Sequence, residues 1–391
     1  MKNLIYLAFC TLLLMGGCSL KQTTSGDPLT RMLVAQTGQS SILVVDLEST
    51  PQVRAVNVPL TSTLPSYTSL RVDSHPWGNV GYVTQGSTKT YWMNLTSGTE
   101  ISSSSGVITN ERLLAPLNNG AYLVAATPQN NMDNGVSSYN TISPNLVNTV
   151  EMTDRLIIDI TACDDNKTIL VANKARQYSS NRVHRHYVTK LVIDQSGRLS
   201  QSGHELLFAA SDEVSIRKIA CAAGAQAGVA MTSNKLISFN IDQNAGFTRV
   251  EEVDAVVNGP SDANDPILKA IVFSPDGTQL FARLATIGTV NYPRGWIEKF
   301  TFNPSNGEIT PTTGWLANAP HTTTQYEEAR LSMGPGGDYI YVPEPGESQI
   351  RVIRTSDGSE ATAITNPQIT SPLYISVGRV TCYAPNHTGC N

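Results

Sequence analysis

Short apolar runs separated by polar turns recur along the whole chain, and they predict β-strands rather than helices. The clearest example is a set of four runs of strand length at residues 267–273, 278–284, 296–302 and 308–310. Ser274-Pro275-Asp276-Gly277 and residues 303–307 lie between these runs. Pro presets φ, Asp bonds its own backbone and Gly adopts positive φ, so both segments are typical of turns. The stretch therefore predicts one antiparallel sheet.

The same unit recurs with a period of roughly 50 residues, which indicates a β-propeller. A third strand followed by a polar turn is found at residues 42–48, 91–98, 191–197, 237–246, 300–307 and 350–358. A pair of first and second strands is found at residues 67–84, 111–126, 156–173, 214–232, 268–284 and 329–342. A single sheet of this kind cannot bury both of its faces, so each unit needs neighbouring copies.

The two ends of the chain complement each other. Residues 32–37, 42–47 and 53–58 fit second, third and fourth strands, with no first strand before them, and residues 372–377 match a first strand. We therefore expect an all-β, seven-bladed β-propeller, with its ring closed by a C-terminal strand that joins the N-terminal blade. No break in composition marks a second domain, so the propeller is expected to span residues 31–391.

Three segments resemble the repeats of a known family. Residues 271–281 (IVFSPDGTQLF), 168–173 (TILVAN) and 41–46 (SILVVD) are similar to repeats of YVTN-type and lactonase-like seven-bladed β-propellers. The resemblance implies the fold, whereas activities within propellers differ widely. Lactonase-like enzymes use acidic, Arg and His groups in the central cleft, and Glu328, Arg330 and His75 lie on expected first strands or their turns, but no motif of that family matches residue by residue. Residues 342–346 depart from the lactonase pattern, so we assign no catalytic residue.

The N-terminal segment predicts export and lipidation. Lys2 precedes an apolar run at residues 4–15, which is too short to span a membrane well. Residues 14–18 (LMGGC) resemble the lipobox of bacterial lipoproteins, with Cys18 as the lipid-bearing residue. Residues 1–17 are then the signal peptide and residues 18–30 the lipidated Cys with a flexible tether. An ordinary signal peptide is the alternative.

Such an export and lipidation segment implies a cell-envelope protein. Ser19, which is not Asp, implies transfer to the outer membrane, with the propeller on the periplasmic side or at the cell surface. Charged residues make up 15% of the 391-residue chain, the net charge is −5 and no long basic run exists, so nucleic-acid binding is not expected. Phosphate-loop, nucleophile-elbow and zinc-protease motifs are also missing from the sequence, and we expect no cofactor.

Charged residues on the first strands are the candidate binding site. When the units are aligned, Arg71, Asp159, Arg217 and Arg330 share the position of Ala270. First strands line the axis of a propeller, and burial of a charge in the packed core between blades is unfavourable. We therefore expect these four residues to form a channel mouth for an anion or an acidic peptide. The alternative is a plugged channel in which the charges pair with one another.

Four cysteines remain once Cys10 leaves with the signal and Cys18 is acylated. Cys382 and Cys390 enclose a short loop, and we expect them to form a disulfide. Cys163 and Cys221 both follow Ala at the end of a first strand, so we align them as equivalent positions in neighbouring blades. They are either a blade-to-blade disulfide or two buried thiols.

The remaining polar clusters carry weaker signals. His184 and His186 form either a metal half-site or part of an exposed basic loop edge, and we favour the loop. Residues 130–135 and 261–265 lack the spacing of a calcium loop, so we interpret both as solvated turns and expect no metal. The contact loops of the propeller are expected near Tyr139, Tyr178 and Tyr187.

The expected role is a protein–protein interaction module that binds an envelope or surface protein and the lipid bilayer. A lactonase-like hydrolase that uses the channel mouth is the alternative, and a small-anion or glycan binder without catalysis is the third reading.

Overall fold

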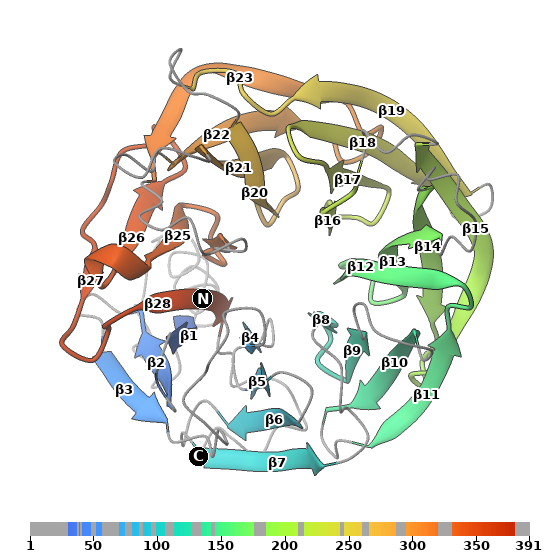
Figure 1. Ribbon diagram of the computed structural model, residues 1–391, viewed down its shortest axis with the longest axis horizontal. Helices are drawn as coiled ribbons and strands as arrows, with labels where there is room; N and C mark the ends of the chain where they lie inside the picture. Colours follow the sequence, from blue (N-terminus) through green and yellow to red (C-terminus); the bar gives the residue numbers. More distant parts are fainter. Residues whose placement is uncertain are drawn as a thin grey trace, which may run out of the picture.

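The protein is an all-β propeller, in which four-stranded antiparallel sheets surround a central axis (Figure 1). A computed structural model describes residues 30–36, 39, 41–47, 52–56, 70–74, 80–85, 89–94, 99–105, 113–126, 134–141, 145–175, 185–209, 215–242, 246–259, 266–286, 295–319 and 331–379. The predicted all-β propeller class is confirmed. Within the described part of the chain, no helix is long and apolar enough to cross a membrane.

The described strands form seven four-stranded sheets. The first combines the two ends of the chain and contains β28 (Pro372–Arg379), β1 (Thr30–Gln36), β2 (Ile42–Asp46) and β3 (Gln52–Val56). The second sheet contains β4 (Leu70–Ser74), β5 (Val80–Gln85), β6 (Lys89–Asn94) and β7 (Thr99–Ser105). The third contains β8 (Leu113–Pro116), β9 (Tyr122–Ala126), β10 (Gly135–Asn140) and β11 (Leu146–Glu151). The fourth contains β12 (Arg155–Ala162), β13 (Thr168–Ala175), β14 (His186–Ile193) and β15 (Leu199–Ala209).

The last three sheets follow in the same strand order. The fifth contains β16 (Lys218–Cys221), β17 (Ala227–Met231), β18 (Lys235–Asp242) and β19 (Gly246–Asp254). The sixth contains β20 (Pro266–Phe273), β21 (Gln279–Thr286), β22 (Gly295–Phe302) and β23 (Ile309–Asn318). The seventh contains β24 (Ser332–Met333), β25 (Tyr339–Glu344), β26 (Gln349–Arg354) and β27 (Ile364–Thr365). A short 3₁₀ helix, η1 (Pro345–Glu347), links β25 to β26.

The inner strands surround the axis. In ring order they are β28, β4, β8, β12, β16, β20 and β24, and each contacts the next, with β24 contacting β28. β28 pairs antiparallel with β1, so that Val34 lies opposite Ile375. The two ends of the described chain therefore share one sheet.

The predicted turn at residues 274–277 is confirmed. Ser274 N–H donates to Gln279 O at 2.9 Å, and the Asp276 carboxylate accepts from both the amide and the hydroxyl of Thr278. Gly277 has a φ of 71°, and a Cβ at this position would lie 2.6 Å from Ala223 N in the next sheet. The turn therefore needs glycine both for its backbone conformation and for the close approach of neighbouring sheets.

Apolar side chains fill the space between adjacent sheets. Between the β20–β23 sheet and the β24–β27 sheet, for example, Phe281, Ile297, Ile340 and Val342 pack together with at most 1% of their surfaces exposed. Because a second strand such as β21 is covered on both faces, it is apolar at most positions rather than at alternate ones.

Candidate functional site

A cavity of about 240 Å³ lies among the inner strands. Its walls come from β8, β12, β16 and β20, together with Leu331 just before β24. Most of the described residues that line the cavity have apolar side chains, but most of the surface that faces it is polar; the polar side chains are those of Asp159, Thr161, Lys218 and Lys269. Side chains that can carry charges of both signs therefore line one small cavity.

Asp159 joins two neighbouring sheets. Its Oδ2 accepts a hydrogen bond from Ile219 N–H at 3.0 Å, and its Oδ1 lies 3.7 Å from Lys218 Nζ. The residue is 7% exposed. A β-bulge between Ile157 and Asp159 shifts the register of β12 at this point. Bulges re-aim side chains, and here the carboxylate reaches across to β16.

The structure corrects the alignment of Arg217. Asp159 lies opposite Ala172, and Ala270 lies opposite Arg283, at matching positions in their sheets. In β16 the matching position is held by Lys218, which lies opposite Met231. Arg217 comes one residue earlier, before the strand begins, and is exposed.

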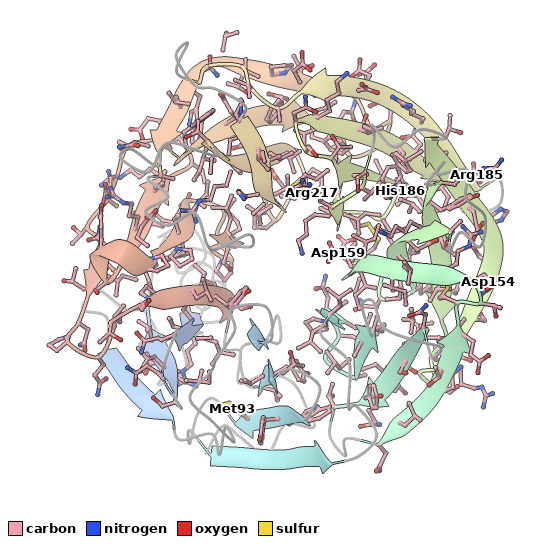
Figure 2. All side chains as sticks on the ribbon, in the orientation of Figure 1. Met93, Asp154, Asp159, Arg185, His186 and Arg217 are labelled. Atoms are coloured by element: carbon pink, nitrogen blue, oxygen red, sulfur yellow. A yellow bond between two sulfur atoms is a disulfide. The ribbon has the colours of Figure 1, made fainter. Side chains whose placement is uncertain are left out.

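The turns explain the error. Cys163 N–H donates to Thr168 O, and Ala222 N–H makes the same bond to Ala227 O. Cys163 therefore corresponds to Ala222 and not to Cys221, so an alignment based on the two cysteines shifts the unit by one residue. Figure 2 labels Asp159 and Arg217 on the inner side of the ring, but only Asp159 lines the cavity.

The other predicted channel residues are only partly described. The backbone pairing of Arg71 with Thr84 gives it the same register position as Asp159, as predicted. Its side chain is not among the described ones. Arg330 and the lactonase-like candidates Glu328 and His75 lie outside the described residues.

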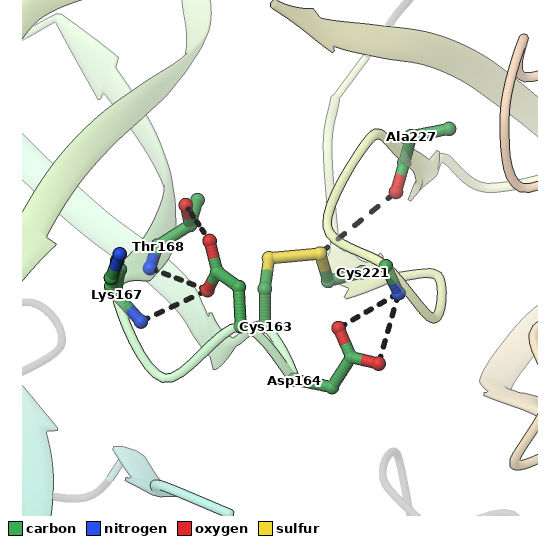
Figure 3. The surroundings of a disulfide bond; sticks show 8 residues. Cys163, Asp164, Lys167, Thr168, Cys221 and Ala227 are labelled. Carbon is green, nitrogen blue, oxygen red and sulfur yellow. Dashed lines mark hydrogen bonds between the residues drawn. A yellow bond between two sulfur atoms is a disulfide. The ribbon is translucent and has the colours of Figure 1, made fainter. Parts of the chain in front are cut away.

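Cys163 and Cys221 form a disulfide across the two sheets, with 5.4 Å between their Cα atoms (Figure 3). This observation decides between the two alternatives left open by the sequence. Beside the disulfide, both carboxylate oxygens of Asp164 accept from Gly224 N–H, at 2.8 and 2.9 Å. The second predicted pair, Cys382 and Cys390, and the lipidation candidate Cys18 lie outside the described residues.

Two of the remaining predictions are wrong. His186 is 3% exposed and pairs within β14, so it does not lie on an exposed loop edge. Tyr139 is 1% exposed and packs edge-on against Trp92, so it is a core residue and not a contact residue. Both residues are buried because they lie on paired strands. The polar residues next to them in the sequence did not indicate this burial.

Tyr187 is half-buried, and the Arg155 guanidinium stacks 3.9 Å from its ring centroid. Tyr178, His184 and residues 130–133 and 261–265 lie outside the described residues. Within the described part of the chain, no group of three His, Cys, Asp or Glu side chains is placed to hold a metal ion.

A buried ion pair went unnoticed in the sequence. Arg283 on β21 donates from Nη2 to Glu344 Oε1 on β25 at 3.1 Å, and neither side chain is exposed. Burial raises the pKa of Glu344 to about 7, although Arg283 partly opposes this shift, and burial lowers the pKa of Arg283. The sequence signal was a charge within each of two otherwise apolar second strands. The pair lies between two sheets and does not line the cavity.

Solved structures share this architecture. A search of family models and of curated proteins finds no match to the sequence. A functionally unknown protein from Desulfotomaculum acetoxidans superposes with a TM-score of 0.66 at 13% identity, covering 89% of this chain and 98% of that one. The periplasmic gluconolactonase PpgL of Pseudomonas aeruginosa superposes with a TM-score of 0.63 at 16% identity, covering 90% and 99%.

A candidate 6-phosphogluconolactonase from Bacteroides fragilis gives a TM-score of 0.62 at 14% identity, covering 91% of this chain and 99% of that one. The chain therefore shares the β-propeller fold of these solved structures. At these identities the likeness concerns the fold alone.

Proposed function

We propose that this protein is an envelope-anchored, seven-bladed and closed β-propeller that binds a small anionic ligand in its central cavity without chemical conversion. The observation that carries the proposal is the presence of two lysines, Lys218 and Lys269, among the residues that line one cavity. Two lysines in one concave site favour an anionic ligand, because opposite charges attract each other at short range.

The contacts of Asp159 favour binding over hydrolysis. It is the only carboxylate that lines the cavity among the described residues. One of its oxygens accepts from Ile219 N–H and the other lies near Lys218. A general base needs an oxygen that is free to contact water or substrate, and both oxygens of Asp159 already face groups of the protein.

The volume of the cavity limits the size of the ligand. A cavity of about 240 Å³ corresponds to the liquid volume of on the order of eight water molecules. This space suits a small organic acid, with its acid group near the lysines and its carbon skeleton against Leu114, Ile160 and Ile219. A long acidic peptide would have to bind outside the cavity.

Isothermal titration calorimetry of the full chain tests the proposal. The probes are D-gluconate and inorganic phosphate, with D-glucose as the uncharged counterpart of gluconate. We expect at least one anion to bind and glucose not to bind. In the Lys218→Met/Lys269→Met variant, affinity should fall by about tenfold or more, because each lost charge contact contributes on the order of 1 kcal/mol.

Lys235→Met is the matched control. Lys235 pairs with Glu252 on the outer strand of its sheet, away from the cavity. This variant should bind the anion as the unmodified protein does. Equal binding by the double variant, or no binding of either anion by the unmodified protein, would contradict the proposal.

Lactone hydrolysis is the second candidate function. Two observations favour it: solved proteins of this fold carry gluconolactonase names, and a carboxylate lies beside ammonium groups in one cavity. Asp159 would activate water, and the lysines would stabilise the developing oxyanion. A pH-stat assay with glucono-δ-lactone tests this: turnover that Asp159→Asn abolishes would support an enzyme, and a rate equal to spontaneous hydrolysis would exclude this substrate.

We also propose that Cys18 carries the lipid and that the protein is anchored in the outer membrane, where the loops of one face contact an envelope or surface protein. The lipobox-like residues 14–18 support the anchor. Labelling with a palmitate analogue should mark the unmodified protein and not Cys18→Ala. A pull-down from mild detergent should recover a stoichiometric partner, and a clean monomer would contradict the interaction role.

A further inference from the structure

We infer that the Cys163–Cys221 disulfide and the Asp164 carboxylate are positioning groups for the central cavity, which hold Asp159 against β16. The inference rests on the proposed function of the cavity. It goes further by identifying what fixes the geometry of one cavity wall.

Three connections join the same two inner strands. Asp159 contacts Ile219 N–H near the middle of the strands, the disulfide joins their ends, and Asp164 accepts from Gly224 N–H in the adjoining turns. They follow one another along β12 and β16, which form part of the cavity wall. We call this set of contacts the β12–β16 seam.

Another boundary between inner strands is joined by a side-chain hydrogen bond. Between β24 and β28, Val377 N–H donates to Ser332 Oγ at 3.0 Å. Among the described residues, the β12–β16 seam is the boundary between inner strands that carries a disulfide. A covalent bond and an acceptor at the ends of two strands restrict their relative sliding.

Sliding would affect the cavity directly. Ile219 N–H donates to Asp159 rather than to β17, so this bond depends on the position of one sheet relative to the next. A shift of one residue would break the bond between Asp159 and the Ile219 amide and would move Lys218, which the proposed anion needs, out of its place in the cavity wall. Catalytic and binding groups need support of this kind, because a displacement of about 1 Å is enough to weaken them.

Amide hydrogen exchange resolved to single residues by NMR tests the inference without any ligand. In Cys163→Ala/Cys221→Ala we expect the Ile219 and Gly224 amides to exchange about tenfold faster or more, beyond any change in amides of β1. Asp164→Asn, which keeps the disulfide and one acceptor oxygen, should accelerate Gly224 and affect Ile219 less.

Leu43→Ala is the matched control for general destabilisation. Leu43 is 1% exposed in β2, in a different sheet, and its truncation should destabilise the fold about as much as the loss of a disulfide. It should accelerate the globally exchanging amides alike, without singling out Ile219. Ile219 and Gly224 amides that stay as protected as β1 amides in the double Cys variant would overturn the inference.

The titration with D-gluconate and phosphate separates this result from the proposed function. If the unmodified protein binds an anion, the double Cys variant should bind it at least several-fold more weakly at a temperature where it remains folded. Unchanged affinity would overturn the positioning role. If the unmodified protein binds neither anion, the proposed function fails, and hydrogen exchange still decides whether the disulfide holds the seam.

Discussion

Two boundaries between neighbouring sheets each carry an ion pair, and they differ in almost every other respect. In the β12–β16 seam, Asp159 and Lys218 lie 3.7 Å apart, with 10% and 18% of their side chains exposed. Between the β20–β23 and β24–β27 sheets, Arg283 and Glu344 lie 3.1 Å apart with no exposure. We call the second boundary the β21–β25 seam, after the strands that carry its charges.

The surroundings of the two pairs decide what each can do. The Asp159–Lys218 pair lies in the cavity wall, where a ligand can reach its charges. The Arg283–Glu344 pair has no exposed side-chain surface, and Phe281, Ile297 and Val342 on the same or paired strands are buried as well. Desolvation makes a buried pair costly and makes a lone buried charge more so, so the second pair affects folding rather than binding. Four predictions follow from this contrast.

The largest effect is expected in the β21–β25 seam. Arg283→Met leaves Glu344 buried without its cation and should cost about 3–5 kcal/mol of unfolding free energy at pH 8. Arg283→Met/Glu344→Leu removes both charges and should recover most of that loss. Denaturant unfolding measures both variants. A single variant within about 0.5 kcal/mol of the unmodified protein would show that the pair is not desolvated.

Loss of the disulfide should come next. Cys163→Ala/Cys221→Ala should lower the unfolding free energy by about 2–4 kcal/mol, because the disulfide closes a long loop in the unfolded chain. The separation of the two cysteines is 58 residues. Thermal and denaturant unfolding should agree on the loss. A variant as stable as the oxidised protein would show that the β12–β16 seam is held by its polar contacts alone.

Glu344 predicts a dependence of stability on pH. Its folded pKa of about 7 is above its ordinary value of 4.5, so the native state binds more protons between these values. Its contribution is therefore fully present below pH 4.5 and is lost as pH rises through 7, on the order of 1–3 kcal/mol. Arg283, Arg351, Glu347 and Glu360 are the charged groups that act on it.

Glu344→Gln tests this dependence, because it keeps the shape of the side chain and removes the titration. The unfolding free energy of the unmodified protein should fall between pH 5 and pH 8, and that of the variant should fall less. Parallel curves for the two proteins would show that Glu344 does not titrate in this range.

The smallest effect on stability is expected at Asp159. Asp159→Asn keeps an acceptor for Ile219 N–H and loses only the attraction to Lys218, so stability should change by no more than about 1 kcal/mol. Removal of the negative charge from the cavity should strengthen binding of D-gluconate by a few-fold, which calorimetry measures. Weaker binding would show that the carboxylate itself holds the ligand.

Local sequence information was sufficient for strands and turns. Residues 267–273 and 278–284 are apolar runs on either side of Ser274-Pro275-Asp276-Gly277, and the structure forms β20, β21 and the turn there. A turn of this kind depends on φ preferences and on bonds within a few residues, so its signal lies in adjacent positions. The repeat of this unit then predicted the propeller class.

Contacts between sheets were much harder to predict. Asp159 lines the cavity, whereas Arg217 was named at the register position that Lys218 occupies, because a shift of one residue changes which side chain lines a wall. Arg283 and Glu344 are 61 residues apart, and nothing in either strand alone indicates its partner.

The sequence by itself thus determined the strand and turn pattern, the repeat and the first-strand position of Asp159, because these depend on residues close together along the chain. Only the tertiary structure decided that Cys163 reaches Cys221 and that Asp159 meets Ile219 and Lys218. Such contacts depend on how one sheet is placed against the next. That placement results from packing of whole faces and from bulges, which no short segment encodes.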